Sequence, residues 1–140
     1  MISNVYMRGD IRMGFWIFMT IMNLLIPLTM ILFGIYFIKK SPKEINTTFG
    51  YRTSMSMKNK DTWEFAHHYC GKLWKNIGLV MLVISIISML FVIGKDNRGV
   101  GTFGGNICII QLIFLVGSIF PTERALKRNF DKDGNKKENS

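Results

Sequence analysis

The sequence MGFWIFMTIMNLLIPLTMILFGIYFI, residues 13–38, contains no charged side chain. An α-helix rises about 1.5 Å per residue, so this stretch exceeds the ~20 residues needed to cross the hydrocarbon core of a bilayer. It is also too long for the apolar region of a cleaved signal peptide, so we expect it to be retained. Two more apolar stretches follow at residues 76–94 and 103–120. The sequence therefore predicts an all-α integral membrane protein with three transmembrane helices.

The charged residues are concentrated in the connections and tails around these stretches, and the formal net charge of the 140-residue chain is +9. Basic residues that flank apolar spans meet anionic lipid head groups, so we predict contact with membrane lipids and no direct binding to nucleic acid. One membrane domain is expected over residues 1–135. The tail at residues 136–140 is polar and follows a segment rich in Asp, Lys, Asn and Gly, so it is expected to be disordered.

The distribution of Lys and Arg predicts the orientation of the chain. Eight of them lie in the connection at residues 39–75 and six in the C-terminal tail, whereas the opposite side holds Arg8, Arg12, Lys95 and Arg98. Because Lys and Arg close to a span resist translocation, the N-terminus is expected outside, and the long connection and the C-terminus in the cytoplasm.

The second half of the long connection has a helical pattern. Asp61 followed by Glu64 is typical of a capping box, which predicts a helix from about residue 61. Apolar residues then recur every three or four positions, at Trp63, Ala66, Cys70, Leu73 and Trp74. This spacing predicts a cytoplasmic interfacial amphipathic helix. The pattern leaves open whether that helix bends at Gly71 or continues straight into the second span. The outer connection, residues 94–105, holds five glycines and is expected to be a flexible turn.

Neutral polar residues in the spans form one predicted layer, because Asn23, Ser85 and Gln111 are expected at similar depths. Hydrogen bonding between helices and a substrate pocket are both compatible with this layer. Pro27, four residues after Asn23, is expected to free a backbone carbonyl and kink the first helix. Charged residues are absent from all three spans, which argues against a pump or a proton relay.

Side chains that bind metals or act in catalysis do not form a complete set. His67, His68, Cys70 and Glu64 suggest a metal site, but adjacent histidines on a helix point about 100° apart, so no metal is predicted and the histidines are interpreted as interfacial. Cys70 and Cys108 are expected too far apart for a disulfide. Without a nucleophile, acid or base in a recognisable arrangement, we predict no enzyme activity and no cofactor.

A compact motif lies in the polar first half of the long connection. It consists of Gly50-Tyr51-Arg52-Thr53 with flanking residues Asn46, Ser56, Asn59, Trp63 and Ala66. This motif resembles the signature of the SdpI-like (SdpI/YfhL) membrane proteins, the immunity family named for protection against a bacterial sporulation-delaying peptide toxin. A tail pattern also resembles the short, three-span members, at Thr122-Glu123, Ala125-Leu126, Phe130-Asp131 and Gly134.

The resemblance implies a protein of the bacterial cytoplasmic membrane that confers immunity to a peptide toxin, with additional signalling by recruitment of a cytoplasmic regulator. The candidate partner-binding residues are then those of the motif, namely Asn46, Gly50, Tyr51, Arg52, Thr53, Ser56, Asn59 and Trp63. Within this set, Gly50 permits a turn, the aromatic rings suit head-group depth, and Arg52 offers a planar fork of donors to a carboxylate, to carbonyls or to a lipid phosphate.

Two roles stay open for Arg52. It could bind a ligand or partner, or it could have a purely structural role in which it donates to the exposed carbonyls of helix ends and holds the loop in place. Two other functions also compete with immunity. One is a small transport or channel component that becomes competent as a homo-oligomer, and the other is an enzyme acting on lipid head groups.

Overall fold

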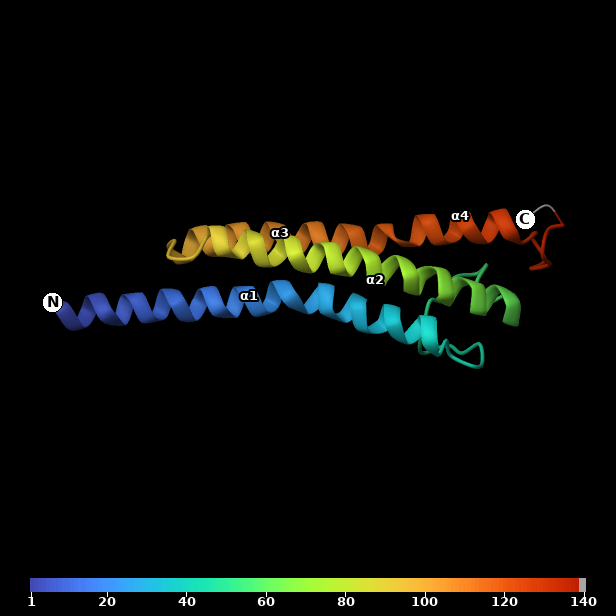
Figure 1. Ribbon diagram of the computed structural model, residues 1–140, viewed down its shortest axis with the longest axis horizontal. Coiled ribbons are helices and arrows are strands. Elements are labelled where there is room, and N and C mark those ends of the chain that lie inside the picture. The colour runs from blue at the N-terminus through green and yellow to red at the C-terminus, as the bar shows by residue number, and fades with distance from the viewer. Residues whose placement is uncertain (139–140) are drawn as a thin grey trace.

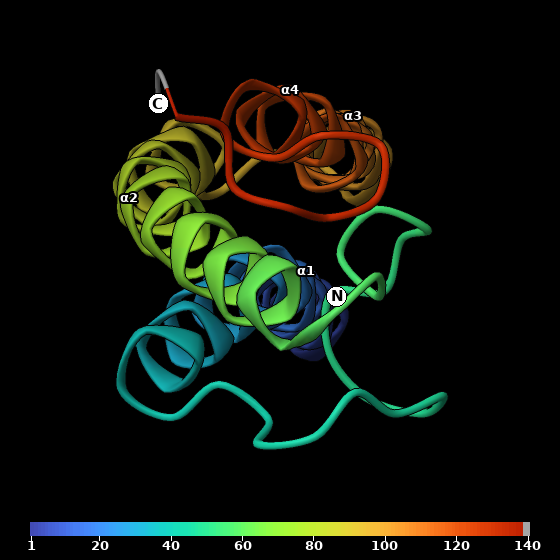
Figure 2. The same ribbon diagram turned by 90° about the vertical axis from the view of Figure 1, so that its right-hand side faces the viewer.

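The computed structural model describes residues 1–138 and contains four α-helices, α1 (Ile2–Lys39), α2 (Lys60–Phe91), α3 (Asn97–Gly117) and α4 (Ile119–Asn129) (Figure 1). Viewed along the bundle, α1, α2 and α3 occupy three corners, and α4 continues the direction of α3 (Figure 2). Three segments are long and apolar enough to cross a membrane, Ile2–Lys39, Lys60–Phe91 and Asn97–Asn129. The predicted all-α chain with three such helices is confirmed.

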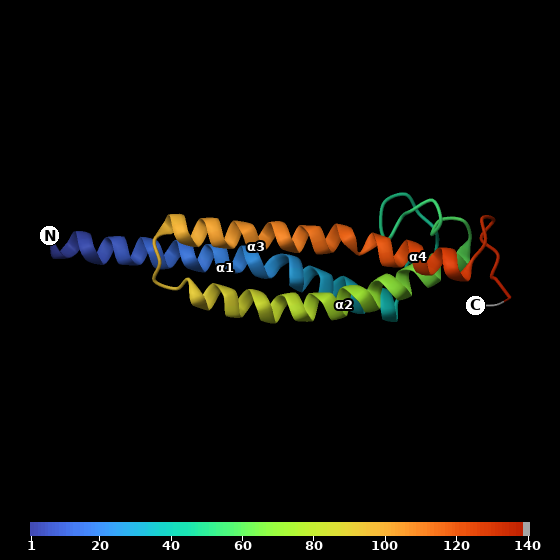
Figure 3. The ribbon, with the colours of Figure 1, turned by 90° about the horizontal axis from the view of Figure 1, so that it is seen from above.

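Helix α1 begins well before the predicted span at residue 13. Residues 1–14 are all exposed, and this part of the helix projects beyond the turn that joins α2 to α3 (Figures 1 and 3). Pro27 lies inside the helix, which stays continuous through it. The ribbon changes direction part-way along α1, as expected where a proline removes one helical hydrogen bond (Figure 1).

Close approach of two backbones holds α1 against α2. A Cβ atom built on Gly71 would lie 2.8 Å from the carbonyl oxygen of Gly34, and one built on Gly34 would lie 2.7 Å from that of Gly71. One built on Gly78, two turns further along α2, would lie 3.0 Å from the carbonyl oxygen of Pro27. Small residues let membrane helices pack this tightly. Gly71 is therefore a packing position within one continuous helix.

The start of α2 differs from the predicted capping box. The cap is Asn59, whose side chain accepts from the Thr62 N–H at 2.9 Å while the Thr62 hydroxyl accepts from the Asn59 N–H at 3.0 Å. The prediction of Asp61 as cap was wrong because two reciprocal bonds from Asn59 satisfy the helix start two residues earlier. The segment predicted as an interfacial amphipathic helix forms the first part of α2, which continues without a break through Gly71 to Phe91.

The glycine-rich connection is mostly helical, which corrects the prediction of a flexible turn. Asp96 accepts from the Gly99 N–H at 3.1 Å and starts α3 at Asn97, so the turn is confined to residues 92–96. A Cβ on Gly104 would lie 2.7 Å from the Met19 methyl carbon. The glycine at 104 thus lets α3 approach α1.

A break at Ser118 separates α3 from α4. Pro121 has no N–H to bond the carbonyl of Gly117, and the Ser118 hydroxyl donates to the Leu115 carbonyl at 2.6 Å. Beyond the break, Thr122 and Leu126 are buried against the bundle, and Arg124, Lys127 and Arg128 are exposed. The amphipathic helix α4 was not predicted as a separate element.

One end of the bundle contains residues 40–59, the first turns of α2, and all of α4. We call it the loop end. Its apolar core consists of Tyr51, Ala66, Cys70, Leu126 and Phe130. The chain beyond α4 folds back on itself, because Phe130 and Lys136 form an isolated antiparallel bridge and the Lys137 N–H donates to the Asn129 carbonyl at 2.9 Å. Of the tail predicted to be disordered, residues 136–138 are thus described, and 139–140 lie outside the described residues.

Candidate functional site

The loop at residues 40–59 is anchored on α1 by a tight turn. The Asn46 side-chain oxygen accepts from the N–H of Thr48 at 3.1 Å and from that of Phe49 at 2.7 Å. This is the local bonding for which asparagine is favoured in turns. The turn places the Phe49 ring 5.8 Å from that of Phe33 and 5.9 Å from that of Phe37. Asn46 therefore shapes the loop.

His67 receives the next part of the loop. The Tyr51 N–H donates to His67 Nε2 at 2.9 Å, and His67 Nδ1 lies 2.8 Å from the Trp63 carbonyl. These two contacts require a neutral imidazole that carries its proton on Nδ1. Gly50 precedes this contact with φ +108°, and any Cβ there would collide with the imidazole ring. Glycine is thus required at position 50 for both its backbone angle and its lack of a side chain.

The interpretation of both histidines as interfacial was wrong for His67, which is completely buried, whereas His68 is exposed. His67 lies outside the predicted second span, which begins at residue 76. Burial lowers the pKa of its imidazole below the usual value of 6.5. Desolvation disfavours the charged form, and the hydrogen bond to Trp63 offsets only part of this effect.

Glu123 on α4 joins the loop to the far end of the chain. Its Oε1 atom accepts from the Tyr51 hydroxyl at 2.8 Å and from the Thr53 hydroxyl at 2.5 Å. Burial raises the pKa of Tyr51 above its usual value, and the neighbouring Glu123 carboxylate raises it further. The phenol is therefore a neutral donor to an anionic acceptor, which is a strong form of hydrogen bond.

The end of the loop is closed by further side-chain bonds. The buried Ser56 hydroxyl accepts from the Thr53 N–H at 2.8 Å and lies 3.0 Å from the Tyr51 carbonyl. Asn59 donates from its side chain to the Gly134 carbonyl at 2.6 Å, and the indole of the buried Trp63 donates to the Pro42 carbonyl at 2.8 Å. These residues stabilise the loop, and their predicted role in binding a partner stays a prediction.

Arg52 differs from its neighbours in the motif. Its side chain is exposed, and it forms no hydrogen bond or ion pair with any residue in the described range 1–138. The alternative in which Arg52 satisfies the carbonyls of helix ends is therefore not what the structure shows. Tyr51 and Thr53 on either side point to Glu123, so the backbone alternates between inward and outward side chains and presents the guanidinium to solvent.

Two residues that hold the loop, His67 and Glu123, were not among the predicted site residues. A signal for Glu123 was present, because it belongs to the tail pattern Thr122-Glu123 that resembles the short family members. His67 carried no such signal, since adjacent histidines on an amphipathic helix look the same whether one of them is buried or both face solvent.

Asn23, Ser85 and Gln111 lie together in the apolar part of the bundle. All three are at most 2% exposed. The Gln111 side-chain amide donates to the Ser85 hydroxyl at 2.7 Å and to the Asn23 carbonyl at 2.9 Å. That carbonyl is the one that Pro27 leaves without a helical donor. Gln111 Oε1 is buried without a hydrogen-bond partner among the described residues.

Metal ligands do not cluster within residues 1–138, because no group of three or more His, Cys, Asp or Glu side chains could hold an ion there. Cys70 and Cys108 are free thiols. Within the motif, the side chains around Arg52 bond to other protein groups and hold the loop, and Arg52 alone is presented to solvent without a partner among residues 1–138.

Comparisons with known proteins agree with the motif. The SdpI/YfhL protein family matches residues 43–122, which include most of the loop, all of α2 and α3, and the first turn of α4. An uncharacterized protein, YfhL of Bacillus subtilis (strain 168), is 31% identical over 102 residues, which cover 70% of this chain and 79% of that protein. No solved structure matches the chain.

Proposed function

Because the chain belongs to the SdpI/YfhL protein family, we propose that it is a membrane immunity protein that protects a bacterial cell against a membrane-active peptide toxin. Its three long apolar helices fit a multi-pass membrane protein. The proposed orientation in the cytoplasmic membrane has the N-terminus outside and the loop end in the cytoplasm, since most Lys and Arg residues lie at the loop end.

The observation that carries the functional part of this proposal is the isolation of Arg52. Five hydrogen bonds hold the loop on either side of Arg52, whose exposed guanidinium is left without an anionic partner among residues 1–138. A guanidinium can give a carboxylate two parallel hydrogen bonds in a defined geometry, and a loop backbone that is already held does not have to be ordered when the partner binds. We assign it to an acidic group of a cytoplasmic regulator, so that the protein signals as well as protects.

The test is survival of toxin-sensitive bacteria that produce this chain when they are challenged with a panel of membrane-active peptides. Wild-type protein is expected to protect against at least one peptide, and Arg52→Ala at equal membrane abundance is expected to protect less. Lys43→Ala is the matched control, because Lys43 is an exposed basic residue of the same connection.

Equal protection by the Arg52→Ala and wild-type proteins would contradict the role of Arg52 in the mechanism. Absence of protection against every peptide would contradict the immunity function itself. Flux of ions or small solutes in proteoliposomes would then support the alternative, an oligomeric transport or channel component.

A second contact with the toxin is proposed at the intramembrane layer. The unpaired Gln111 Oε1 is an acceptor in an apolar setting, where a peptide N–H or hydroxyl gains more from a hydrogen bond than it does in water. Gln111→Leu is expected to reduce protection more than Ser88→Ala, a change at a half-buried serine of the same bundle. Equal protection by the two variants would exclude this contact.

A further inference from the structure

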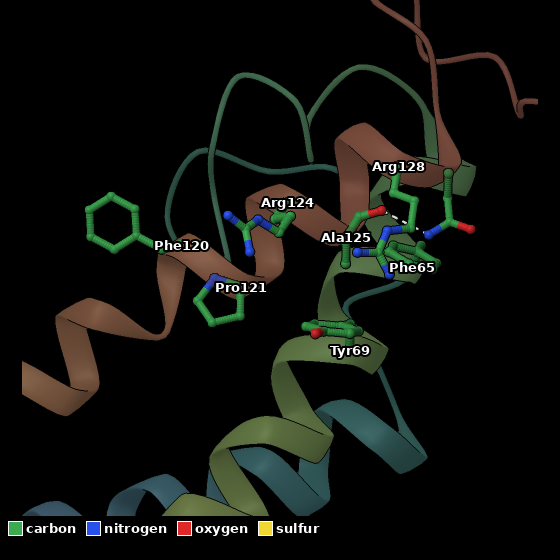
Figure 4. A pocket seen from close by; sticks show the side chains of 8 residues that line it. Phe65, Tyr69, Phe120, Pro121, Arg124, Ala125 and Arg128 are labelled. Carbon is green, nitrogen blue, oxygen red and sulfur yellow. Dashed lines mark hydrogen bonds between the residues drawn. The ribbon is translucent and has the colours of Figure 1, made fainter.

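A cavity of about 720 Å³ opens at the loop end between α2 and α4, and Arg52 is not among the residues that line it. The wall from α2 is aromatic and consists of Phe65 and Tyr69, whose rings stack with 6.1 Å between centroids. The wall from α4 carries Phe120 and Pro121 at one end and the two arginines, Arg124 and Arg128, along its length (Figure 4). The volume is within the usual range for a small-molecule site, about 300–1,000 Å³.

The two arginines are a pair without a counter-charge. They are four residues apart on α4, so their side chains leave the same face of the helix one turn apart. Both are exposed, and neither forms an ion pair or hydrogen bond with residues 1–138. The neighbouring Glu123 carboxylate is directed instead to the Tyr51 and Thr53 hydroxyls. The cavity therefore combines an aromatic wall from α2 with two guanidinium groups from α4 that have no partner among residues 1–138.

The position of the cavity along the chain favours an amphiphilic ligand. Phe120 ends the predicted third span and is 76% exposed, and Arg124 follows one helical turn later, about 6 Å further along the axis. One end of the cavity thus borders the apolar stretch, and the other lies at the level expected for lipid head groups. Tyr69 and Phe65 line the same cavity from α2, and the amphipathic ring of a tyrosine is suited to a membrane interface.

We propose that this cavity binds an anionic phospholipid, with the phosphate held by Arg124 and Arg128 and the adjoining glycerol and acyl carbons packed on Tyr69, Phe65 and Phe120. The planar guanidinium of arginine can donate two hydrogen bonds to a phosphate in a fixed geometry, which the ammonium of lysine cannot, and basic pockets between membrane helices are suited to anionic head groups. The site is independent of the proposed immunity function, because it uses neither Arg52 nor the intramembrane polar layer. Bound lipid would join α4 to α2 across the loop end.

The test is lipid titration of the purified full-length protein, followed by native mass spectrometry from detergent micelles. The probes are dioleoylphosphatidylglycerol, which is anionic, and dioleoylphosphatidylcholine, which has the same acyl chains and no net charge. The variant Arg124→Gln/Arg128→Gln is expected to bind phosphatidylglycerol about 30-fold more weakly than wild type, since each basic residue contributes about fivefold. Phosphatidylcholine is expected to bind wild type as weakly as it binds the variant.

The control variant is Lys40→Gln/Lys132→Gln, which removes the same charge from exposed positions of the loop end outside this cavity. An equal loss in the two double variants would overturn the proposal in favour of diffuse surface attraction. Equal binding of the two lipids by wild type would also overturn it. Displacement of the lipid by inorganic phosphate at equal concentration would assign the cavity to free anions instead. Circular dichroism and thermal unfolding establish beforehand that both variants are folded.

Discussion

Two regions of the molecule are stabilised in different ways. Close packing of backbones holds α1 against α2, whereas side-chain hydrogen bonds hold the loop end together. At the interface, Gly34 and Gly71 bring backbones so close that a single added carbon would contact the other helix at less than 3 Å. At the loop end, hydrogen bonds reach across 16 residues from Tyr51 to His67 and 72 residues from Tyr51 to Glu123. The first region is therefore sensitive to added volume, and the second to the loss of a donor or acceptor.

The largest effect is expected from adding one carbon to the interface. Gly71→Ala should lower the free energy of unfolding by about 2–3 kcal/mol, because the new Cβ meets the rigid carbonyl of Gly34. Gly105→Ala is the matched control, since nothing lies within 4 Å of a Cβ there, and alanine's higher helix propensity should stabilise by up to about 1 kcal/mol. Unfolding in detergent measures the free energy for both variants. If both were destabilised or both were stabilised, the proposed close contact between Gly71 and Gly34 would be contradicted.

A smaller loss is expected from removing the acceptor at the loop end. Glu123→Ala leaves the Tyr51 and Thr53 hydroxyls without their partner, which should cost about 2 kcal/mol and speed proteolysis of residues 40–59. Glu64→Ala removes an exposed carboxylate near the same helices and should change stability by less than about 0.5 kcal/mol. Equal proteolysis rates in the two variants would show that Glu123 does not hold the loop.

The contact between His67 and the loop predicts a dependence on pH. The pKa of His67 is lower in the folded protein than the ordinary value of 6.5, so the unfolded state binds more protons below that pH. Stability should be constant above about pH 6.5 with respect to this group and should fall as the pH decreases toward about 5. Thermal unfolding of His67→Gln should lose this dependence, whereas His68→Gln should keep it. The same slope in both variants would assign the effect to other groups.

The smallest effect on stability is expected at Arg52. Arg52→Ala should change the free energy of unfolding by less than about 0.5 kcal/mol, because no described contact of the folded chain is lost. Comparison of the free energy of unfolding of Arg52→Ala with its protection in the survival assay separates a role in binding from a role in folding. A loss above about 1 kcal/mol would place Arg52 among the residues that hold the loop, together with Tyr51 and Thr53.

Much of the fold could be predicted from local patterns. Uncharged stretches of about 20 residues must be helical in a bilayer, because only a helix satisfies its own backbone groups there. The helix ends were harder to predict. Asn59 and Asp61 are both acceptable caps in isolation, and the choice between them was made by the reciprocal bonds with Thr62. The glycines at 99–105 suggested a turn, although Asp96 starts a helix before them.

The candidate site was predicted less completely. The motif around Gly50-Tyr51-Arg52-Thr53 singled out the loop as the candidate segment, but it did not distinguish the side chains that fold the loop from the one that is exposed without a partner. That distinction depends on His67 and Glu123, which are far away in the sequence and reach the loop only after α2 and α4 have packed. The polar layer of Asn23, Ser85 and Gln111 was predictable from depth alone, whereas the bond from Gln111 to the carbonyl freed by Pro27 was not.

The sequence by itself determined that the chain has three long apolar helices, that its basic residues lie mostly at one end, and that it resembles one membrane family. These properties depend on composition and local spacing, which act before any long-range contact forms. Only the tertiary structure decided that Gly71 is a contact point and not a bend, that His67 is buried while His68 is not, and that Arg52 faces solvent. Each of these depends on which atoms of a distant helix lie within a few ångströms.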